Sequence, residues 1–75
     1  MKQYRIKTRA GVYAGSLVKI DRYGEMRPSG FAPTKVKLFA RVYSEGDVYQ
    51  IRADIMRLAE FVRGEIESIT LEEVA

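Results

Sequence analysis

One amphipathic segment, residues 44 to 64, constrains the fold of this chain more than any other part of the sequence. Ser44 is a favourable helix N-cap, Asp47 is placed to complete a capping box, and Gly64 suits the left-handed position that ends a helix. Six apolar residues between them recur at the spacing of one helix face: Val48, Ile51, Ile55, Leu58, Ala59 and Val62. The pattern predicts a helix over about residues 45 to 63 whose apolar stripe faces a core.

The rest of the chain favours strands. Apolar and polar residues alternate, as expected for half-buried strands, over about residues 3–8, 12–21, 35–43 and 66–72. Residues 22–34 hold both prolines and two of the six glycines, which predicts a loop. The predicted order of elements is therefore β-β-β-α-β.

This order predicts an α+β fold, and 75 residues fit a single small domain, residues 1–75. A right-handed crossover through the helix would place the last strand parallel to the first and third strands, and beside the first. The expected result is a mixed sheet with the one helix packed on one face. The opposite face of the sheet would then have no covering element.

The absence of two residue types limits the reactions and the metal sites that the side chains of this protein can support. The chain contains no histidine and no cysteine, so it lacks the commonest general base, the commonest metal ligand and any thiol. The sequence therefore predicts no catalytic residues, no cofactor site and no metal site, and we expect a protein that is not an enzyme. A site built from carboxylates alone is the alternative that this composition leaves open. Its apolar runs are too short to span a membrane, and the N-terminus lacks the apolar stretch of a signal peptide. We therefore expect a cytoplasmic protein with no membrane partner.

Charge is divided unevenly along the chain. Residues 1–43 contain ten lysines and arginines against two acids, whereas residues 44–75 contain three arginines against eight acids. Such a division bears on partners rather than on the fold. It is compatible with an anionic ligand on the N-terminal half, with head-to-tail association of two copies, or with two solvated faces of opposite sign.

The N-terminal pattern Lys2-x-Tyr4-x-Ile6-x-Thr8-x-x-Gly11-x-Tyr13 resembles the start of small accessory proteins encoded by phages and prophages of Gram-positive bacteria. The later part is also similar, because an alternating segment, Phe39 to Ser44, precedes an amphipathic helix, a glycine and a short terminal strand. The resemblance covers most of the chain. It implies a cytoplasmic, phage-associated protein of unknown biochemical role, and it implies no particular functional residue.

Basic and aromatic residues share the predicted uncovered face of the sheet. On the strand phases given above, this candidate binding surface carries Arg5, Lys7, Tyr13, Leu17, Lys19, Phe39, Arg41 and Tyr43. An exposed apolar patch bordered by charges favours a protein interface. Cations that pair with phosphates and rings that stack on bases would also suit single-stranded nucleic acid.

The predicted helix offers a second candidate surface. Tyr49, Ala53 and Met56 are spaced to lie together outside the core stripe, as a candidate interface for a partner helix. Asp54 and Arg57 are spaced as an ion pair on the helix surface. We expect a non-enzymatic accessory protein that acts through protein–protein contacts, as a homodimer or with another protein. Nucleic-acid binding through the open sheet face is the alternative.

Overall fold

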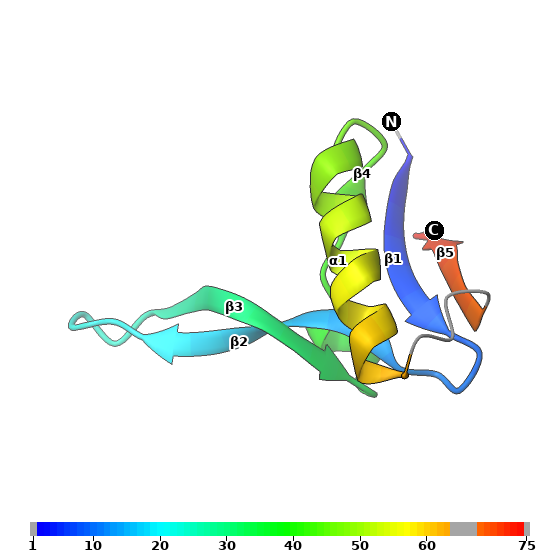
Figure 1. Ribbon diagram of the computed structural model, residues 1–75. Coiled ribbons are helices and arrows are strands. Elements are labelled where there is room, and N and C mark those ends of the chain that lie inside the picture. Colours follow the sequence, from blue (N-terminus) through cyan, green and yellow to red (C-terminus); the bar gives the residue numbers. More distant parts are fainter. Residues whose placement is uncertain (1, 64–67, 75) are drawn as a thin grey trace.

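Five β-strands, one short 3₁₀-helix and one α-helix make up the part of the chain that the structure describes, residues 2–63 and 68–74 (Figure 1). The computed structural model gives them in this order: β1 (Gln3–Thr8), β2 (Tyr13–Ile20), β3 (Met26–Thr34), η1 (Lys37–Phe39), β4 (Tyr43–Ser44), α1 (Val48–Phe61) and β5 (Ile69–Glu73). The predicted α+β class, with a helix packed against a sheet, is confirmed for these residues.

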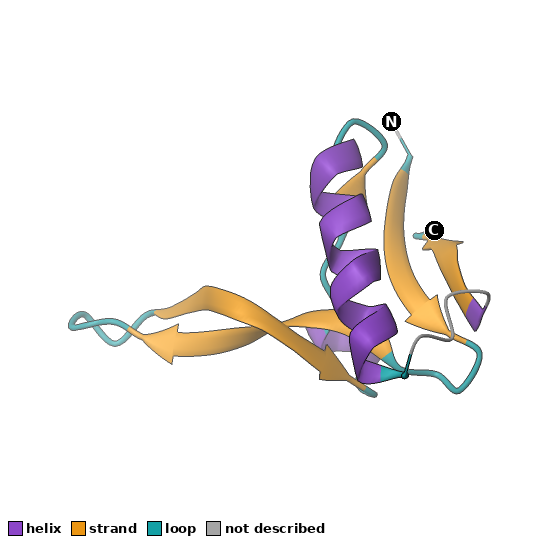
Figure 2. Ribbon diagram, in the orientation of Figure 1, coloured by secondary structure: helices purple, strands orange, loops and turns teal. Residues whose placement is uncertain are grey.

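β1 lies at the centre of the sheet (Figure 2). Along one side it pairs with β5 over Tyr4 to Thr8. Along the other side it pairs first with β4 and then, at Lys7 opposite Tyr13, with β2. β2 continues away from β1 and pairs with β3 in a long ribbon. Every strand pairing among the described residues is antiparallel, so the prediction of a mixed sheet is wrong.

The last strand runs in the opposite direction to the one predicted because the chain forms one more strand before the helix. β3 occupies residues predicted as a loop, and an added antiparallel strand reverses the direction of everything after it. β5 is therefore antiparallel to β1. It is parallel to β4, because β4 also pairs antiparallel with β1. β4, α1 and β5 thus form a split β-α-β unit around β1.

β3 forms despite its two prolines and one glycine. It lies at the edge of the sheet, where a residue without an N–H is tolerated. Gly30 has a positive φ of 146° and lies where the register with β2 is irregular. Asp21 organises the turn between the two strands, since its carboxylate accepts two backbone N–H groups at 2.9 and 3.0 Å. The predicted loop, residues 22–34, is therefore a hairpin turn followed by an edge strand.

The predicted third strand, residues 35–43, is instead a segment that crosses the sheet. It contains η1, and only its end joins the sheet, as β4. Ala40 forms an isolated bridge with Gly15 of β2. A Cβ at position 15 would lie 3.1 Å from the carbonyl oxygen of Phe39, so glycine permits this close crossing. The crossing segment covers part of the sheet face opposite α1, which was predicted to be uncovered.

α1 begins at Val48, later than the predicted start at residue 45. Its N-cap is Asp47, whose carbonyl oxygen accepts the N–H of Ile51 at 2.9 Å. The predicted N-cap, Ser44, belongs to β4, and its N–H donates to Asp47 Oδ2 at 3.1 Å. A turn between Ser44 and Asp47 therefore delays the start of the helix.

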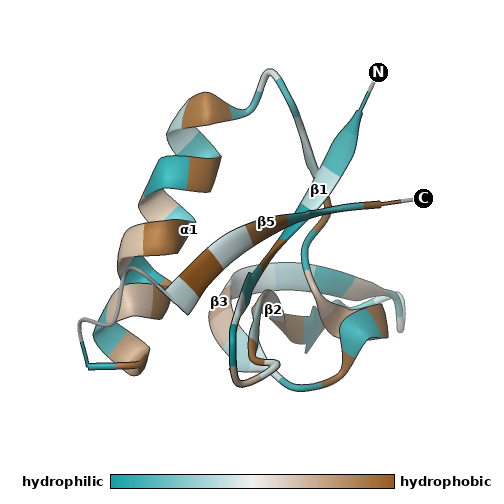
Figure 3. Cartoon of the chain, turned by 90° about the vertical axis from the view of Figure 1, so that its right-hand side faces the viewer, coloured by the Kyte–Doolittle hydropathy of each residue, from teal (hydrophilic) through white to brown (hydrophobic). Residues whose placement is uncertain are grey.

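The core lies between α1 and the sheet. Leu58 and Ala59 of the predicted stripe are buried. Partly buried Ile51 and Ile55 pack against a cluster of Ile6, Val12, Ala14, Tyr43 and Leu58. Figure 3 shows that hydrophobic and hydrophilic residues alternate in short groups along α1, which is the pattern of an amphipathic helix. Val48 is 53% exposed, so its prediction as a core residue is wrong. It lies in the first turn, at an open crevice that Tyr4 and Leu71 also line.

Two predictions fall outside the described residues: the helix stop at Gly64 and the start of the last strand at residue 66. Within the described part, β5 begins at Ile69. The helices of this part include none with the length and apolar content needed to cross a membrane.

Candidate functional site: an apolar arm and the charged cluster at its base

The β2–β3 ribbon projects from the rest of the molecule as an arm, which we define as residues 17–30 (Figures 1 and 2). β2 is buried from Tyr13 to Gly15, where it passes the core, and exposed from Leu17 to its end. The radius of gyration is 12.6 Å. A compact chain of this length is expected to have a value of roughly 11 Å. The difference agrees with an arm that extends into solvent.

One face of the arm is apolar. The register pairs Val18 with Pro28 and Ile20 with Met26, so these four side chains share a face; we call them the arm strip. Phe31, on the same face nearer the core, packs against the core cluster. The strip therefore extends the core outward, yet Ile20 is 73% exposed and Met26 is 71% exposed. The described part of the chain leaves this apolar surface uncovered.

A groove with a volume of about 890 Å³ lies between the arm and the rest of the molecule. Arm-strip residues form one wall. The crossing segment supplies the facing apolar side chains, Leu38, Phe39 and Val42, all of them exposed. Asp47 and Gln50 border the groove at the N-terminal end of α1. The groove thus combines apolar walls with one acidic end.

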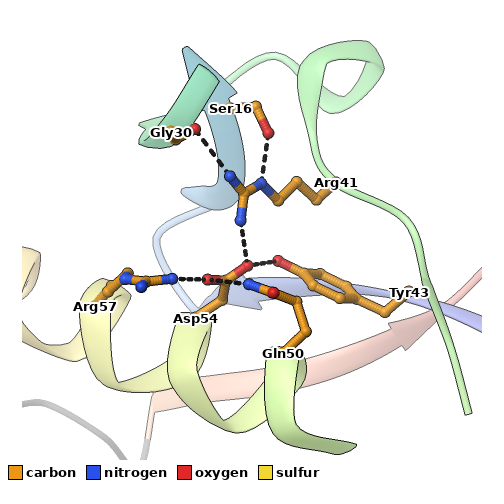
Figure 4. Close-up of polar contacts among 7 residues, drawn as sticks. All are labelled: Ser16, Gly30, Arg41, Tyr43, Gln50, Asp54 and Arg57. Carbon is orange, nitrogen blue, oxygen red and sulfur yellow. Dashed lines mark hydrogen bonds and ion pairs between the residues drawn. The ribbon is translucent and has the colours of Figure 1, made fainter. Parts of the chain in front are cut away.

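A buried carboxylate lies at the base of the arm (Figure 4). Asp54 of α1 is fully buried. Arg41 and Arg57 each donate to it at 2.7 Å, Gln50 donates at 3.0 Å, and the Tyr43 hydroxyl also donates. We call these five residues the Asp54 cluster. Two donors reach each carboxylate oxygen, so all four acceptor positions of the carboxylate are occupied.

These donors keep Asp54 ionised. Burial raises the pKa of the Asp54 carboxyl, but the hydrogen bonds from Tyr43, Arg41, Arg57 and Gln50 outweigh it, and the net pKa is lowered. Burial also raises the pKa of Tyr43, and its hydrogen bond to Asp54 raises it further, so the hydroxyl keeps its proton and donates. With every acceptor position filled, Asp54 has none left for the proton of a substrate. The arrangement indicates a structural role.

Arg41 connects this cluster to the arm (Figure 4). Its guanidinium donates to Asp54, to the hydroxyl of Ser16 in β2, and to the carbonyl oxygen of Gly30 in β3 at 2.8 Å. The guanidinium also lies 5.9 Å from the centre of the Phe31 ring. One side chain therefore ties β2 and β3 to α1 at the base of the arm and fixes the direction in which the arm leaves the molecule.

A second ionic cluster lies on the opposite face of the sheet. Glu72 of β5 pairs with Lys7 at 3.0 Å and with Lys37 of η1 at 2.9 Å. It also accepts a hydrogen bond from the Tyr13 hydroxyl at 3.3 Å. We call these four residues the Glu72 cluster. The cluster joins β1, β2 and β5 to η1 and so holds the crossing segment on the sheet.

Glu72 gives the stability of the fold a specific pH dependence. Hydrogen bonds from Lys37 and Lys7 lower its pKa from 4.5 to about 2. Because the folded state has the lower pKa, Glu72 stabilises the fold fully above about pH 4.5, and this contribution is lost as the pH falls toward 2. We expect Glu72→Gln to lower the free energy of unfolding above that range and to have little effect at its acid end. Urea denaturation of both proteins across the range measures the difference.

The control for this measurement is Glu73→Gln, which removes the exposed acid next to Glu72. It should leave the pH dependence close to that of the wild type. A gap between wild type and Glu72→Gln that stays constant from neutral to acid pH would contradict the ion-pair role of Glu72.

Arg41 and Tyr43 do not lie on the open face where the sequence places them. Both belong to the Asp54 cluster, and Tyr43 is only 2% exposed. The turn of η1 shifts the phase of the alternation between residues 35 and 43. Tyr43 also pairs with Tyr4, which lines the crevice beside α1, so it shares the helix side of the sheet.

The other six residues of the predicted face do not form one platform either. Lys7 and Tyr13 lie opposite the helix, but within the Glu72 cluster, where Tyr13 is buried. Arg5 is half-buried, and its Nε has no hydrogen-bond partner within the described structure. The remaining three are exposed on the arm or on η1: Leu17, Lys19 and Phe39.

The second candidate surface lies on α1. Tyr49 and Met56 are exposed, and Ala53 between them is half-buried. Their placement agrees with a set of residues outside the core stripe. Their use as an interface stays a prediction.

The sequence pattern predicts neither the pairing of β2 with β3 that builds the arm nor the Asp54 cluster. The expected Asp54–Arg57 ion pair forms at 2.7 Å, but the carboxylate is buried rather than on the helix surface. A signal for this was present, since Asp54 is three residues after Ile51 and four before Leu58 and thus lies within the apolar stripe. A carboxylate in such a stripe requires buried donors.

Comparisons with known proteins give no relative for this chain: no protein-family model, no curated protein and no solved structure matches it. Among the described residues, no group of three or more acidic, histidine or cysteine side chains is arranged to hold a metal ion. The features from which a function can be argued are therefore the exposed arm strip and the cluster that fixes the arm.

Proposed function

We propose that the protein is a non-enzymatic, cytoplasmic accessory protein of the phage type, and that it acts through protein–protein contacts made by the arm strip and the groove. The observation that carries this proposal is the exposure of an apolar strip built directly onto the core. Single apolar residues on a surface are common, whereas a contiguous set bordered by charges marks an interaction site.

The fixed direction of the arm supports the same proposal. Arg41 holds both strands at the base of the arm, and Asp21 closes the turn at its tip with backbone hydrogen bonds and an ion pair to Arg27 at 2.8 Å. A surface that is already ordered loses less conformational entropy on binding than a flexible one. The arm strip therefore suits a partner with a defined complementary surface.

Nucleic-acid binding has less support than the sequence pattern suggested. Arg41 is engaged with Asp54 and Lys7 with Glu72, so neither is free to meet a phosphate. Tyr13 and Tyr43 are buried and cannot stack on a base.

Photo-crosslinking tests the proposal with a matched pair of positions. A photoreactive phenylalanine analogue replaces Met26 on the arm strip or Met56 on α1, both exposed methionines. In cells that express the chain, we expect protein adducts from position 26 and far fewer from position 56. Adding Ile20→Ser to the position 26 variant should remove most of these adducts, because Ile20 lies opposite Met26 on the strip.

Two outcomes would contradict the proposal. Protein adducts from position 56 alone would move the interaction to the helix surface of Tyr49, Ala53 and Met56. Adducts of position 26 with nucleic acid rather than protein would favour the alternative function.

A further inference from the structure

We infer that the partner of the arm is a second copy of this chain, and that two copies clasp each other about a twofold axis with the arm of each in the groove of the other. The inference rests on the proposed function of the arm strip and names its partner. The molecule has the shape of an L, with α1 and β1 in one limb and the arm in the other (Figures 1 and 2).

The groove lies in the inner corner of this L, and the arm is both a wall of the groove and a projection of similar apolar character. A twofold dimer requires one patch that fits itself, with residue i meeting residue j in both directions. Here the strip of one copy, including Val18 and Met26, would meet Phe39 and Val42 of the other copy. The same contact forms twice.

The surface area supports an uncovered interface of the right size. The chain exposes 5716 Å² for a mass of 8.6 kDa. A compact monomer of that mass exposes about 4,700 Å² by the usual scaling of surface with mass. The chain therefore exposes roughly 1,000 Å² more than a compact monomer would. Each partner in a standard protein interface buries a similar area, about 800 Å². A chain this short also has a thin core, which association commonly supplements.

Charges at the two ends of the patch are complementary. Arg22 in the turn at the tip of the arm forms no ion pair within the described residues, whereas the two acids beside it, Asp21 and Glu25, are paired with Arg27. Asp47 borders the groove, Glu45 lies two residues before it, and both acids are exposed and unpaired with a cation in that same part of the chain. A clasped dimer brings the unpaired Arg22 of each copy to the acidic end of the partner's groove, which selects one direction of docking.

The exposed edge of β3 favours a dimer in which the faces of the two arms pack, rather than one in which their strands pair. β3 is an edge strand, and Pro28 and Pro33 supply no N–H. Such an edge is a poor template for a further strand. The arm strip is the surface that remains for contact with a second copy.

Sedimentation equilibrium on the full chain, from micromolar to millimolar concentration, tests the inference. We expect a species of twice the 8.6 kDa chain mass. Met26→Ser should raise the dissociation constant of this dimer by at least about tenfold, whereas Met56→Ser should leave it unchanged. Circular dichroism verifies that both variants fold, which is expected because both methionines are exposed.

Disulfide trapping tests the docking direction, and the absence of native cysteine makes it specific. Arg22→Cys is mixed with Asp47→Cys under mild oxidation, and a covalent dimer of the two variants is expected on a non-reducing gel. Glu45→Cys replaces Asp47→Cys if loss of the helix N-cap impairs folding. A mixture of Arg22→Cys with Glu60→Cys, at an exposed site on α1, should give little product.

A monomer at every concentration, or trapping of position 22 with position 60 in preference to 47 and 45, would overturn the inference. These results are distinguishable from failure of the proposed function. If the chain is monomeric but position 26 crosslinks to another protein, the arm is still a protein-binding site. If position 26 crosslinks neither to a second copy nor to another protein, the inferred dimer and the proposed protein-binding function are both wrong.

Discussion

Replacing Asp54 with alanine is expected to lower the free energy of unfolding by about 3–5 kcal/mol, the effect of removing one partner of a buried charged network. The variant leaves Arg41 without its carboxylate and leaves the buried Tyr43 hydroxyl without an acceptor. A domain of this length has a total stability of only about 4–11 kcal/mol. The change therefore removes a large part of it, and urea denaturation followed by circular dichroism measures the loss.

Arg57→Ala is the matched control, because Arg57 donates to the same carboxylate from a half-exposed position. Its loss should cost under about 1 kcal/mol, as for other exposed ion pairs. A double-mutant cycle with Arg41→Met and Asp54→Leu isolates the coupling between the two charges. If Asp54→Ala were no more destabilising than Arg57→Ala, the cluster would not anchor the arm.

The helix and the first two strands could be predicted because their patterns follow from local physical chemistry. The stripe containing Leu58 and Ala59 has helical period, and the alternation in residues 3–8 has strand period. Both segments are buried on one face, so hydrophobic patterning alone determines which side faces the core.

β3 and η1 could not be predicted because their conformations depend on tertiary context. Residues 26–34 have turn composition, yet they form a strand because an edge position tolerates both prolines. Residues 35–43 alternate like a strand, yet they cross the sheet because Gly15, far away in sequence, leaves room for a backbone. Because the strand forms at residues 26–34 instead of 35–43, β5 runs opposite to the predicted direction and Tyr43 lies in the core.

The candidate site was missed for the same reason. The arm strip combines residues from β2 with residues from a segment whose composition predicts a loop. These residues become neighbours only when β3 pairs with β2 in the observed register. The Asp54 cluster likewise gathers donors from α1, from β4 and from the segment before it. Asp54 alone carried a local signal, because an acid within an apolar stripe must find partners in the core.

The close crossing at Gly15 gives the second large effect. We expect Gly15→Ala to lower the free energy of unfolding by about 1–3 kcal/mol, the usual cost of adding a group to a packed site. The new Cβ would lie 2.8 Å from the carbonyl oxygen of Ala32 and 2.8 Å from Thr34 Cγ2, in addition to its contact with Phe39. Backbone atoms on two sides cannot yield without displacing β3 or η1. Urea denaturation measures the change in stability.

Gly46→Ala is the control, because a Cβ there meets no atom within 4 Å and the backbone needs no positive φ. It should be neutral, or stabilising by up to about 1 kcal/mol through the lower entropy of the unfolded chain. Hydrogen exchange locates the effect of Gly15→Ala. The amides of Phe39 and Ala40, which bond to Val36 and Lys37 at 3.0 and 3.1 Å, should lose protection before those of α1. Equal loss in both places, or unchanged stability, would mean that the crossing segment does not depend on glycine at position 15.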